Sequence, residues 1–187
     1  IQAYKGKQIM TSDSLSYGQH FDHNVDAKNA GAKLVKRNLS DIAAMGGHPS
    51  HALLTLLCGD NLRLEWLSDF IIGIKENCEY YKVLLVGGDI SSIPPGQFSS
   101  VLSLYGYLEQ EPLLRSGSKS GDTIYVTGSL GGSSINKHYN FLPRLAEGRW
   151  LAESGACSAL IDLTDGIAKD LKELVPPQCA AYLTLER

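Results

Sequence analysis

Two stretches of the chain repeat apolar residues every three or four positions, the period that places them on one face of an α-helix. The first covers residues 26–45, and Gly46-Gly47 followed by Pro49 ends it. The second covers residues 63–80 and is clearly amphipathic. Its apolar stripe contains Trp66, Phe70, Ile74 and Cys78. We therefore predict two amphipathic helices in the first half of the chain.

Short apolar runs around these helices predict strands. Continuous runs favour buried strands, and stretches rich in β-branched, aromatic and small residues favour further ones. The expected strands cover residues 8–10, 52–58, 83–86, 99–108 and 123–127, and a third helix is expected over 165–175. Because strands and helices mix without strict alternation, we predict an α+β fold rather than a doubly wound sheet.

A change in composition near Glu111 and Pro112 suggests a domain boundary, because a strand ends there and a Gly/Ser/Lys segment follows. We expect an N-terminal domain over residues 1–110 and part of a C-terminal domain over residues 111–187. The chain starts at Ile1 rather than Met, and it stops directly after an apolar segment. We therefore expect that a longer protein is only partly represented.

Composition narrows the partners. The formal net charge is -3 and no Lys/Arg run occurs, which argues against a nucleic-acid partner. No apolar stretch approaches the roughly 18 to 20 residues of a membrane span. The four cysteines are widely spaced and form no C-x-x-C pair, so we expect reduced, mostly buried thiols in a cytoplasmic protein.

Carboxylates directly follow several predicted strands. Asp13, Asp89 and Asp162 each stand behind such a run, and two glycines precede Asp89. A strand delivers a side chain rigidly to the edge of a sheet, and carboxylates together with substrate phosphates are the ligands that Mg²⁺ prefers. The alternative is that each Asp merely forms a turn.

Asn38, Ser40 and Asp41 interrupt an otherwise apolar helical segment. They are either functional or the cap of a new helix, and the sequence leaves both readings open. Two histidine pairs are spaced by three, His20 with His23 and the pair flanking Pro49-Ser50. Such spacing occurs in zinc sites, but no H-E-x-x-H motif is present, so solvated loop histidines are favoured.

Two loops have residues suited to phosphate. Residues 115–119 form a small basic loop containing Arg115, whose guanidinium could hold a phosphate in bidentate fashion. Residues 128–132 are Gly-rich and follow a predicted strand. Neither loop matches G-x-G-x-x-G or the Walker pattern, and the protein-kinase signatures are absent. An ATP site here would therefore belong to neither of the two commonest designs.

Six segments, in order, resemble the thiamine-monophosphate kinases, a family grouped with aminoimidazole-ribotide synthetase and selenophosphate synthetase. Together they span nearly the whole chain, which makes the set far more specific than any one motif. The segments are Met-Thr-Ser-Asp-Ser-Leu at 10–15, His-Phe at 20–21, Asn-Leu-Ser-Asp-Ile-Ala-Ala-Met-Gly-Gly-His-Pro at 38–49, Val-Gly-Gly-Asp at 86–89, Arg-Ser-Gly-Ser-Lys-Ser-Gly-Asp-Thr-Ile-Tyr-Val-Thr-Gly at 115–128 and Ile-Asp-Leu-Thr-Asp-Gly at 161–166.

The resemblance implies an aminoimidazole-ribotide synthetase-like fold, with a mixed sheet in an N-terminal α/β domain and a partial C-terminal α+β domain. It also implies a homodimer formed through N-terminal sheets, and phosphoryl transfer from ATP to thiamine monophosphate with several Mg²⁺ ions. Residues 99–107 are of the kind that could lie in such a dimer interface. The implied metal ligands are Thr11, Ser12, Asp13, Asp41, Asp89, Asp162 and Asp165. Gly88, Asp89, Arg115 and Thr164 would face ATP, His20 would contact thiamine monophosphate, and Arg115 and Asp41 would serve catalysis.

The chain departs from the family pattern in three places. This sequence lacks the paired Asp-Asp that the family has near the N-terminus, and it lacks the C-terminal region that contacts thiamine. The stretch over residues 133–141 is shorter than the corresponding stretch in the family, which usually contains a helix. Two alternatives therefore stand beside the kinase: another ATP-using enzyme of the same group, such as a selenophosphate synthetase, or an inactive protein that only binds nucleotide or dimerises.

Overall fold

The computed structural model describes residues 6–184. Four strands form one sheet in the order β1-β4-β2-β3. Their bounds are β1 (Lys7–Ser16), β2 (His48–Gly59), β3 (Leu84–Ile93) and β4 (Phe98–Leu108). β4 pairs antiparallel with both β1 and β2, whereas β2 and β3 are parallel. The sheet is therefore mixed, as the family resemblance implied.

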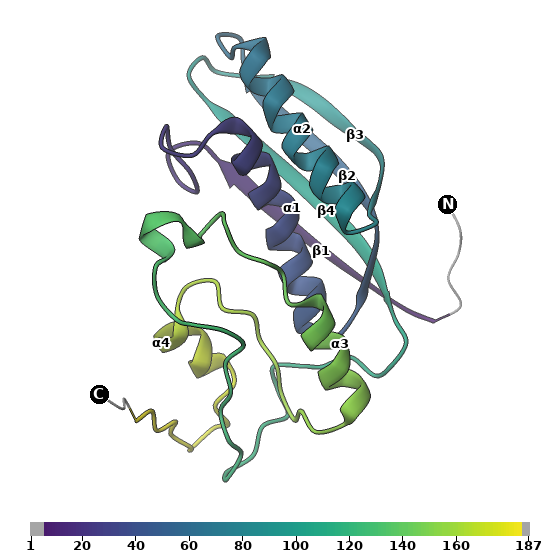
Figure 1. The fold of residues 1–187 in the computed structure, drawn as a ribbon, viewed down its shortest axis with the longest axis vertical. Coiled ribbons are helices and arrows are strands. Elements are labelled where there is room, and N and C mark those ends of the chain that lie inside the picture. The colour runs from purple at the N-terminus through teal and green to yellow at the C-terminus, as the bar shows by residue number, and fades with distance from the viewer. Residues whose placement is uncertain (1–5, 185–187) are drawn as a thin grey trace.

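Two long helices connect the first three strands and cover one face of the sheet (Figure 1). They are α1 (Ala27–Ala44) and α2 (Leu64–Tyr80), within two residues of their predicted bounds. α1 begins after Asp26, whose carboxylate accepts the backbone N–H of Asn29 at 2.8 Å. It ends at Ala44, and the chain then turns at Gly46, where a φ of 72° suits glycine.

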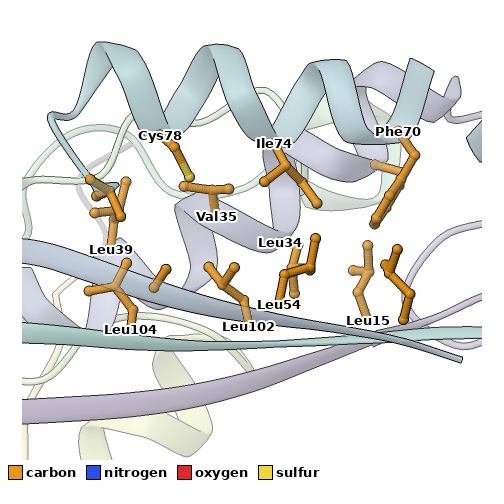
Figure 2. Packing of buried hydrophobic residues seen from close by; sticks show 14 of the residues in the cluster. Leu15, Leu34, Val35, Leu39, Leu54, Phe70, Ile74, Cys78, Leu102 and Leu104 are labelled. Atoms are coloured by element: carbon orange, nitrogen blue, oxygen red, sulfur yellow. The ribbon is translucent and has the colours of Figure 1, made fainter. Parts of the chain in front are cut away.

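The hydrophobic core lies between these helices and the sheet, as Figure 2 shows. Leu102 and Leu104 point from β4 toward the two helices, and Leu34 of α1 and Phe70 of α2 point back toward the sheet. All four side chains are fully buried. Alternate residues of β4 point to the opposite face and stay partly exposed. On that face, Met10 of β1 is 72% exposed, so one side of the sheet carries an uncovered apolar surface.

The second half of the chain is mostly irregular. α3 packs against the C-terminal end of α1 (Figure 1). The elements are η1, a single π-helical turn (Ser133–Lys137), α3 (Leu145–Ser154), α4 (Ile167–Asp170) and the short 3-10 helix η2 (Leu171–Glu173). In residues 6–184 no helix has both the length and the apolar character needed to cross a membrane.

Three strand predictions were wrong in extent or burial. β1 runs to Ser16 rather than ending at residue 10, because its polar residues alternate with Ile9 and Leu15 along a strand with one buried face. β3 continues to Ile93, so Asp89 lies inside it rather than behind it. β2 alternates between buried and more exposed residues, because only one face of the sheet is covered. β3 is largely exposed on both faces, because it is an edge strand.

Predictions for the second half were less accurate. Residues 123–127 form no strand, and the residues directly before Asp162 form none either. The helix expected over 165–175 is split into α4 and η2. All four cysteines are free thiols, as predicted, but only Cys78 is buried, and Cys179 is exposed.

Close contact between α1 and α2 depends on two glycines. A Cβ on Gly31 would lie 2.1 Å from the carbonyl oxygen of Phe70, and one on Gly73 would lie 2.0 Å from that of Lys28. Both distances are far inside van der Waals contact with backbone, which cannot move without separating the helices. Glycine is therefore required at this crossing despite its low helix propensity.

We expect Gly73→Ala to lower the free energy of unfolding by about 1–3 kcal/mol, the usual cost of overpacking. This is the reverse of the gain of about 1 kcal/mol that Ala gives over Gly in an unconstrained helix. Urea titration measures the change, and Ser68→Ala on the exposed side of α2 is the control. A more stable Gly73→Ala protein would contradict the close crossing.

Candidate functional site

The C-terminal half of α1 lies against β1 and brings polar side chains together. Along β1, odd-numbered residues face the helices, so Thr11 and Asp13 point toward α1. The Thr11 hydroxyl donates a hydrogen bond to the carboxylate of Asp41. Arg37, one turn earlier on α1, donates to Asp13 at 3.1 Å and to the carbonyl oxygen of Ser14 at 2.7 Å. The ambiguity at Asp41 is thereby resolved: it lies inside α1 and caps no helix.

A third carboxylate, Asp162, reaches the same place from the irregular segment before α4. Its charge raises the pKa of Asp13, and the charge of Asp41 in turn raises the pKa of Asp162. One oxygen, Oδ2, is buried without a hydrogen-bond partner among the described residues. An unpaired buried carboxylate oxygen is costly, because it has lost water without gaining a donor. A cation bound at Oδ2 would remove that cost.

The pKa values of the Asp13, Asp41 and Asp162 carboxyl groups are all raised. Burial is the main cause that raises the pKa of each, and neighbouring carboxylates add to it. Arg37 partly offsets the shift at Asp13, as do the Thr11 hydroxyl at Asp41 and Ser40 at Asp162. The compensation is incomplete, since all three pKa values stay above the ordinary range. The group therefore favours a positive ligand.

Arg115 and the turn at residues 164–166 border this group. Arg115 is exposed, and its charge lowers the pKa of both Asp41 and Asp162. The turn is held by buried Asp170, whose Oδ2 accepts the backbone N–H groups of residues 164, 165 and 166 at 2.8, 3.0 and 3.1 Å. Thr164 is thereby fixed in position. Asp165 is exposed and forms a salt bridge with Lys169, which lowers its pKa.

Ser12 lies between Thr11 and Asp13 in sequence but on the other face of the sheet. Its hydroxyl is 2.9 Å from that of Ser103 on β4. The side chain therefore points away from Asp41 and Asp162, as strand alternation requires. The structure does not bring the Ser12 side chain together with the three carboxylates.

Gly88 and Asp89 are also separate from the carboxylate group. They lie on β3, which is one edge of the sheet, whereas Thr11 and Asp13 lie on β1 at the other edge. Three strand spacings, about 14 Å, divide the two edges. Asp89 is exposed and accepts a hydrogen bond from Ser91 at 3.1 Å.

His20 lies just beyond the end of β1. Its Nδ1 accepts the backbone N–H of Ser16 at 3.0 Å. Burial, followed by the charges of Arg37 and Lys33, lowers the pKa of His20. It is thus a neutral histidine near cations, at the opposite end of α1 from Asp41.

No preformed metal cage exists in the described part of the chain. Among residues 6–184, no three His, Cys, Asp or Glu side chains are arranged to hold a metal ion alone. The histidine pairs form no zinc site; His48 instead stacks on Tyr107 with ring centroids 4.9 Å apart. Mg²⁺ does not need such a cage, because it commonly binds one or two carboxylates and takes its other ligands from phosphates and water.

Sequence reasoning missed four supporting residues. Arg37 stands four residues before Asp41, and Lys33 four before Arg37, so all three share one helix face. This spacing could have identified Arg37 and Lys33 from the sequence alone. Ser40 was left open as either a functional residue or a helix cap and was given no specific role, and nothing in the sequence pattern singled out Asp170.

Residues 2–107 match the family described as AIR synthase related protein, N-terminal domain. This stretch is more than half of the 187 residues. The chain belongs to the AIR synthase-related family. The predicted fold class, a mixed sheet with helices in an aminoimidazole-ribotide synthetase-like arrangement, is confirmed.

Within this family, the chain is similar to thiamine-monophosphate kinases. The protein from Buchnera aphidicola subsp. Acyrthosiphon pisum is 35% identical over 95% of this chain and 60% of its own length. The one from Escherichia coli strain K12 is 32% identical over 94% of this chain and 59% of its own length. The chain thus spans about three fifths of the curated relatives it matches.

Solved structures agree with this similarity. The thiamine monophosphate kinase from Aquifex aeolicus superimposes with a TM-score of 0.74 and 28% identity, covering 81% of this chain and 57% of that chain. A structure described as AaThiL complexed with AMPPCP and TMP gives a TM-score of 0.84 and 28% identity, covering 94% of this chain and 62% of that chain. The resemblance inferred from the six sequence segments is confirmed.

The crowded carboxylates make a prediction about stability. We expect Asp162→Asn to raise the melting temperature of the metal-free protein by ~2–4 °C, the shift that about 1 kcal/mol gives in a chain of this size. The amide removes one buried negative charge, so the gain is largest above the raised pKa of Asp162 and shrinks as the pH falls through it.

Calorimetry at two pH values in EDTA measures this difference. Asp60→Asn, at an exposed turn, is the matched control and should leave the melting temperature unchanged. A destabilised Asp162→Asn protein at neutral pH would show that the carboxylate is satisfied without a cation.

Proposed function

We propose that this chain carries the magnesium- and ATP-binding part of a thiamine-monophosphate kinase. The reaction transfers the terminal phosphoryl group of ATP to the phosphate of thiamine monophosphate, giving ADP and thiamine diphosphate. The observation that carries the proposal is the meeting of Asp13, Asp41 and Asp162, with one carboxylate oxygen left unpaired. The similarity to thiamine-monophosphate kinases over most of the chain supports the choice of substrates.

The donor set fits Mg²⁺. Asp13, Asp41 and Asp162 offer hard oxygen ligands, and Thr11 holds Asp41 in place through its hydroxyl. Bound Mg²⁺ would neutralise phosphate charge, so that two anionic phosphoryl groups could approach each other. Arg37 keeps Asp13 ionised and oriented, which prepares it for a cation. Burial of the three carboxylates strengthens every one of these interactions.

Arg115 and Thr164 would contact the nucleotide. Arg115 is exposed beside the carboxylates, so its guanidinium is free to take charge that develops on the transferred phosphoryl group. Thr164 sits on the turn that Asp170 fixes, which leaves its hydroxyl available to ATP. Asp165 would reach a metal only after releasing Lys169, and Ser12 only through its backbone, because its side chain faces away.

A homodimer would place Gly88 and Asp89 in the site. Within one chain they lie on the far edge of the sheet from Asp13. A two-fold interface uses the same surface on both copies, so β3 of one copy could approach β1 of the other. Exposed apolar residues support this interface, namely Met10, Leu53, Leu84, Leu85, Val86 and Ile90. Several Mg²⁺ ions could then bind between the two copies.

Two further features belong to the proposal. Residues 1–110 would form the dimerising domain and residues 111–187 the start of a second domain, since the last residue of the sheet is Leu108. We place the protein in the cytoplasm because its four cysteines are free thiols, which persist in reducing compartments.

Replacing Asp41 tests the proposed function. In the intact protein, we expect Asp41→Asn to keep the fold but lower kcat by about 10²-fold or more, as loss of a charge-stabilising group does. ADP release with thiamine monophosphate and Mg²⁺ measures turnover, and Asp60→Asn is the control. Unchanged turnover in Asp41→Asn would contradict the metal role. ATP consumption with selenide but not with thiamine monophosphate would replace the assigned substrate.

Mixing two inactive variants tests the shared site. Asp41→Asn and Asp89→Asn proteins should each be nearly inactive, but a mixed dimer has one site free of both substitutions if Asp89 acts across the interface. Random mixing of equal amounts would then restore about a quarter of wild-type activity. Failure to restore activity in verified mixed dimers would place Asp89 outside the partner's site.

A further inference from the structure

Lys33 is a buried cation without a counter-charge. The residue is 8% exposed, and its ammonium donates to the carbonyl oxygen of His20 at 2.5 Å and lies 2.8 Å from Nδ1 of His138. Among residues 6–184, no carboxylate forms a salt bridge with it. The charge of Arg37, another cation, acts on it and disfavours its protonated form. Burying a charge in this way costs free energy that a bound anion would offset.

The two histidines beside Lys33, His20 and His138, can each donate a hydrogen bond from Nε2. Nδ1 of His20 accepts a backbone N–H, and the ammonium of Lys33 is a donor that requires Nδ1 of His138 to accept. In neutral imidazoles this leaves the proton of each ring on Nε2. Burial, with the charge of Lys33 adding to it, lowers the pKa of both rings and keeps them neutral. Lys33 also has a third N–H beyond its two contacts.

Burial, followed by the charge of Arg37, lowers the pKa of Lys33 to about 8. The three groups therefore offer N–H donors and one unsatisfied positive charge, but no charged acceptor. That combination suits a tetrahedral dianion such as a phosphate monoester. A carboxylate would use fewer of the donors.

The position of Lys33 fits the acceptor substrate. Lys33, Arg37 and Asp41 stand on one face of α1, and the eight residues from Lys33 to Asp41 span roughly 12 Å. A metal ion and two phosphoryl groups in line fill a space of that order. One phosphate at Lys33 and another beside the carboxylates would thus face each other along the helix.

We propose that Lys33, together with His20 and His138, binds the phosphate group of the acceptor, a phosphate monoester. This inference rests on the proposed function and adds Lys33 and His138 as substrate-binding residues. His138 belongs to the short segment 133–141, which is also held to α1 by Lys36. The Lys36 ammonium donates to the carbonyl oxygen of Tyr139 at 3.3 Å and lies 6.0 Å from the ring centroid of Phe141.

Lys36 supplies a matched control. Lys36→Met removes a charge that holds the same segment to the same helix, but no histidine contacts it. In the intact protein, Lys33→Met should raise the KM for thiamine monophosphate by about 10- to 100-fold and leave the KM for ATP within about twofold. Lys36→Met should leave both KM values within about twofold. Equal effects of the two variants on the KM for thiamine monophosphate would show that Lys33 only holds residues 133–141 against α1, and would overturn the inference.

Direct binding separates this inference from the proposed function. Calorimetric titration with inorganic phosphate, without ATP, should show binding to wild type and Lys36→Met but not to Lys33→Met. If Lys33→Met does not fold, His138→Gln takes its place and should weaken phosphate binding at least about tenfold. Phosphate binding through Lys33 in a protein without kinase activity would refute the proposed function and keep the anion site. No phosphate binding by an active kinase would refute the site alone.

Discussion

The carboxylates of Asp13, Asp41 and Asp162 share a half-buried space between β1, α1 and the segment before α4. The rest of the site depends on the groups that compensate these three negative charges. Arg37 lies against Asp13, the Thr11 hydroxyl against Asp41, and Arg115 near both Asp41 and Asp162. These groups offset only part of the cost, because burial, with the neighbouring carboxylates adding to it, still raises the pKa of each carboxyl. The remaining imbalance is what a divalent cation with phosphate ligands would correct.

Helix α1 organises the site along its length. Its buried face packs in the core with Leu34 and Leu39, and the close crossing with α2 at Gly31 fixes its position over the sheet. The adjoining face then holds a cationic end near Lys33 and an anionic end near Asp41. A helix is rigid enough to keep the two ends at a fixed separation, which phosphoryl transfer requires of its two phosphates.

Much of the fold was predictable from the sequence, because α1 and α2 bury one face each and so show a clear 3.6-residue period. β1 was predicted too short because Thr11, Ser12 and Asp13 look like a polar loop, whereas two of them face the site. β3 was predicted as buried from its apolar residues, yet it is an exposed edge strand. An apolar edge can be explained by a partner surface that a single sequence does not reveal.

The candidate site was only partly predictable. Motif resemblance selected Asp13, Asp41 and Asp162, but no local pattern shows that an irregular segment carries Asp162 to β1. Asp170 and His138 depend in the same way on tertiary contacts between residues distant in sequence. The Lys33 and Arg37 positions could have been found, since spacing by four places them on the face of Asp41.

A crystal of the intact protein grown with Mn²⁺ and the ATP analogue AMPPCP tests the central claim most directly. Anomalous difference maps should show metal ions bound to the carboxylates of Asp13, Asp41 and Asp162 and bridging them to the nucleotide phosphates. Metal ions bound only to the nucleotide, with these three carboxylates unliganded, would contradict the account.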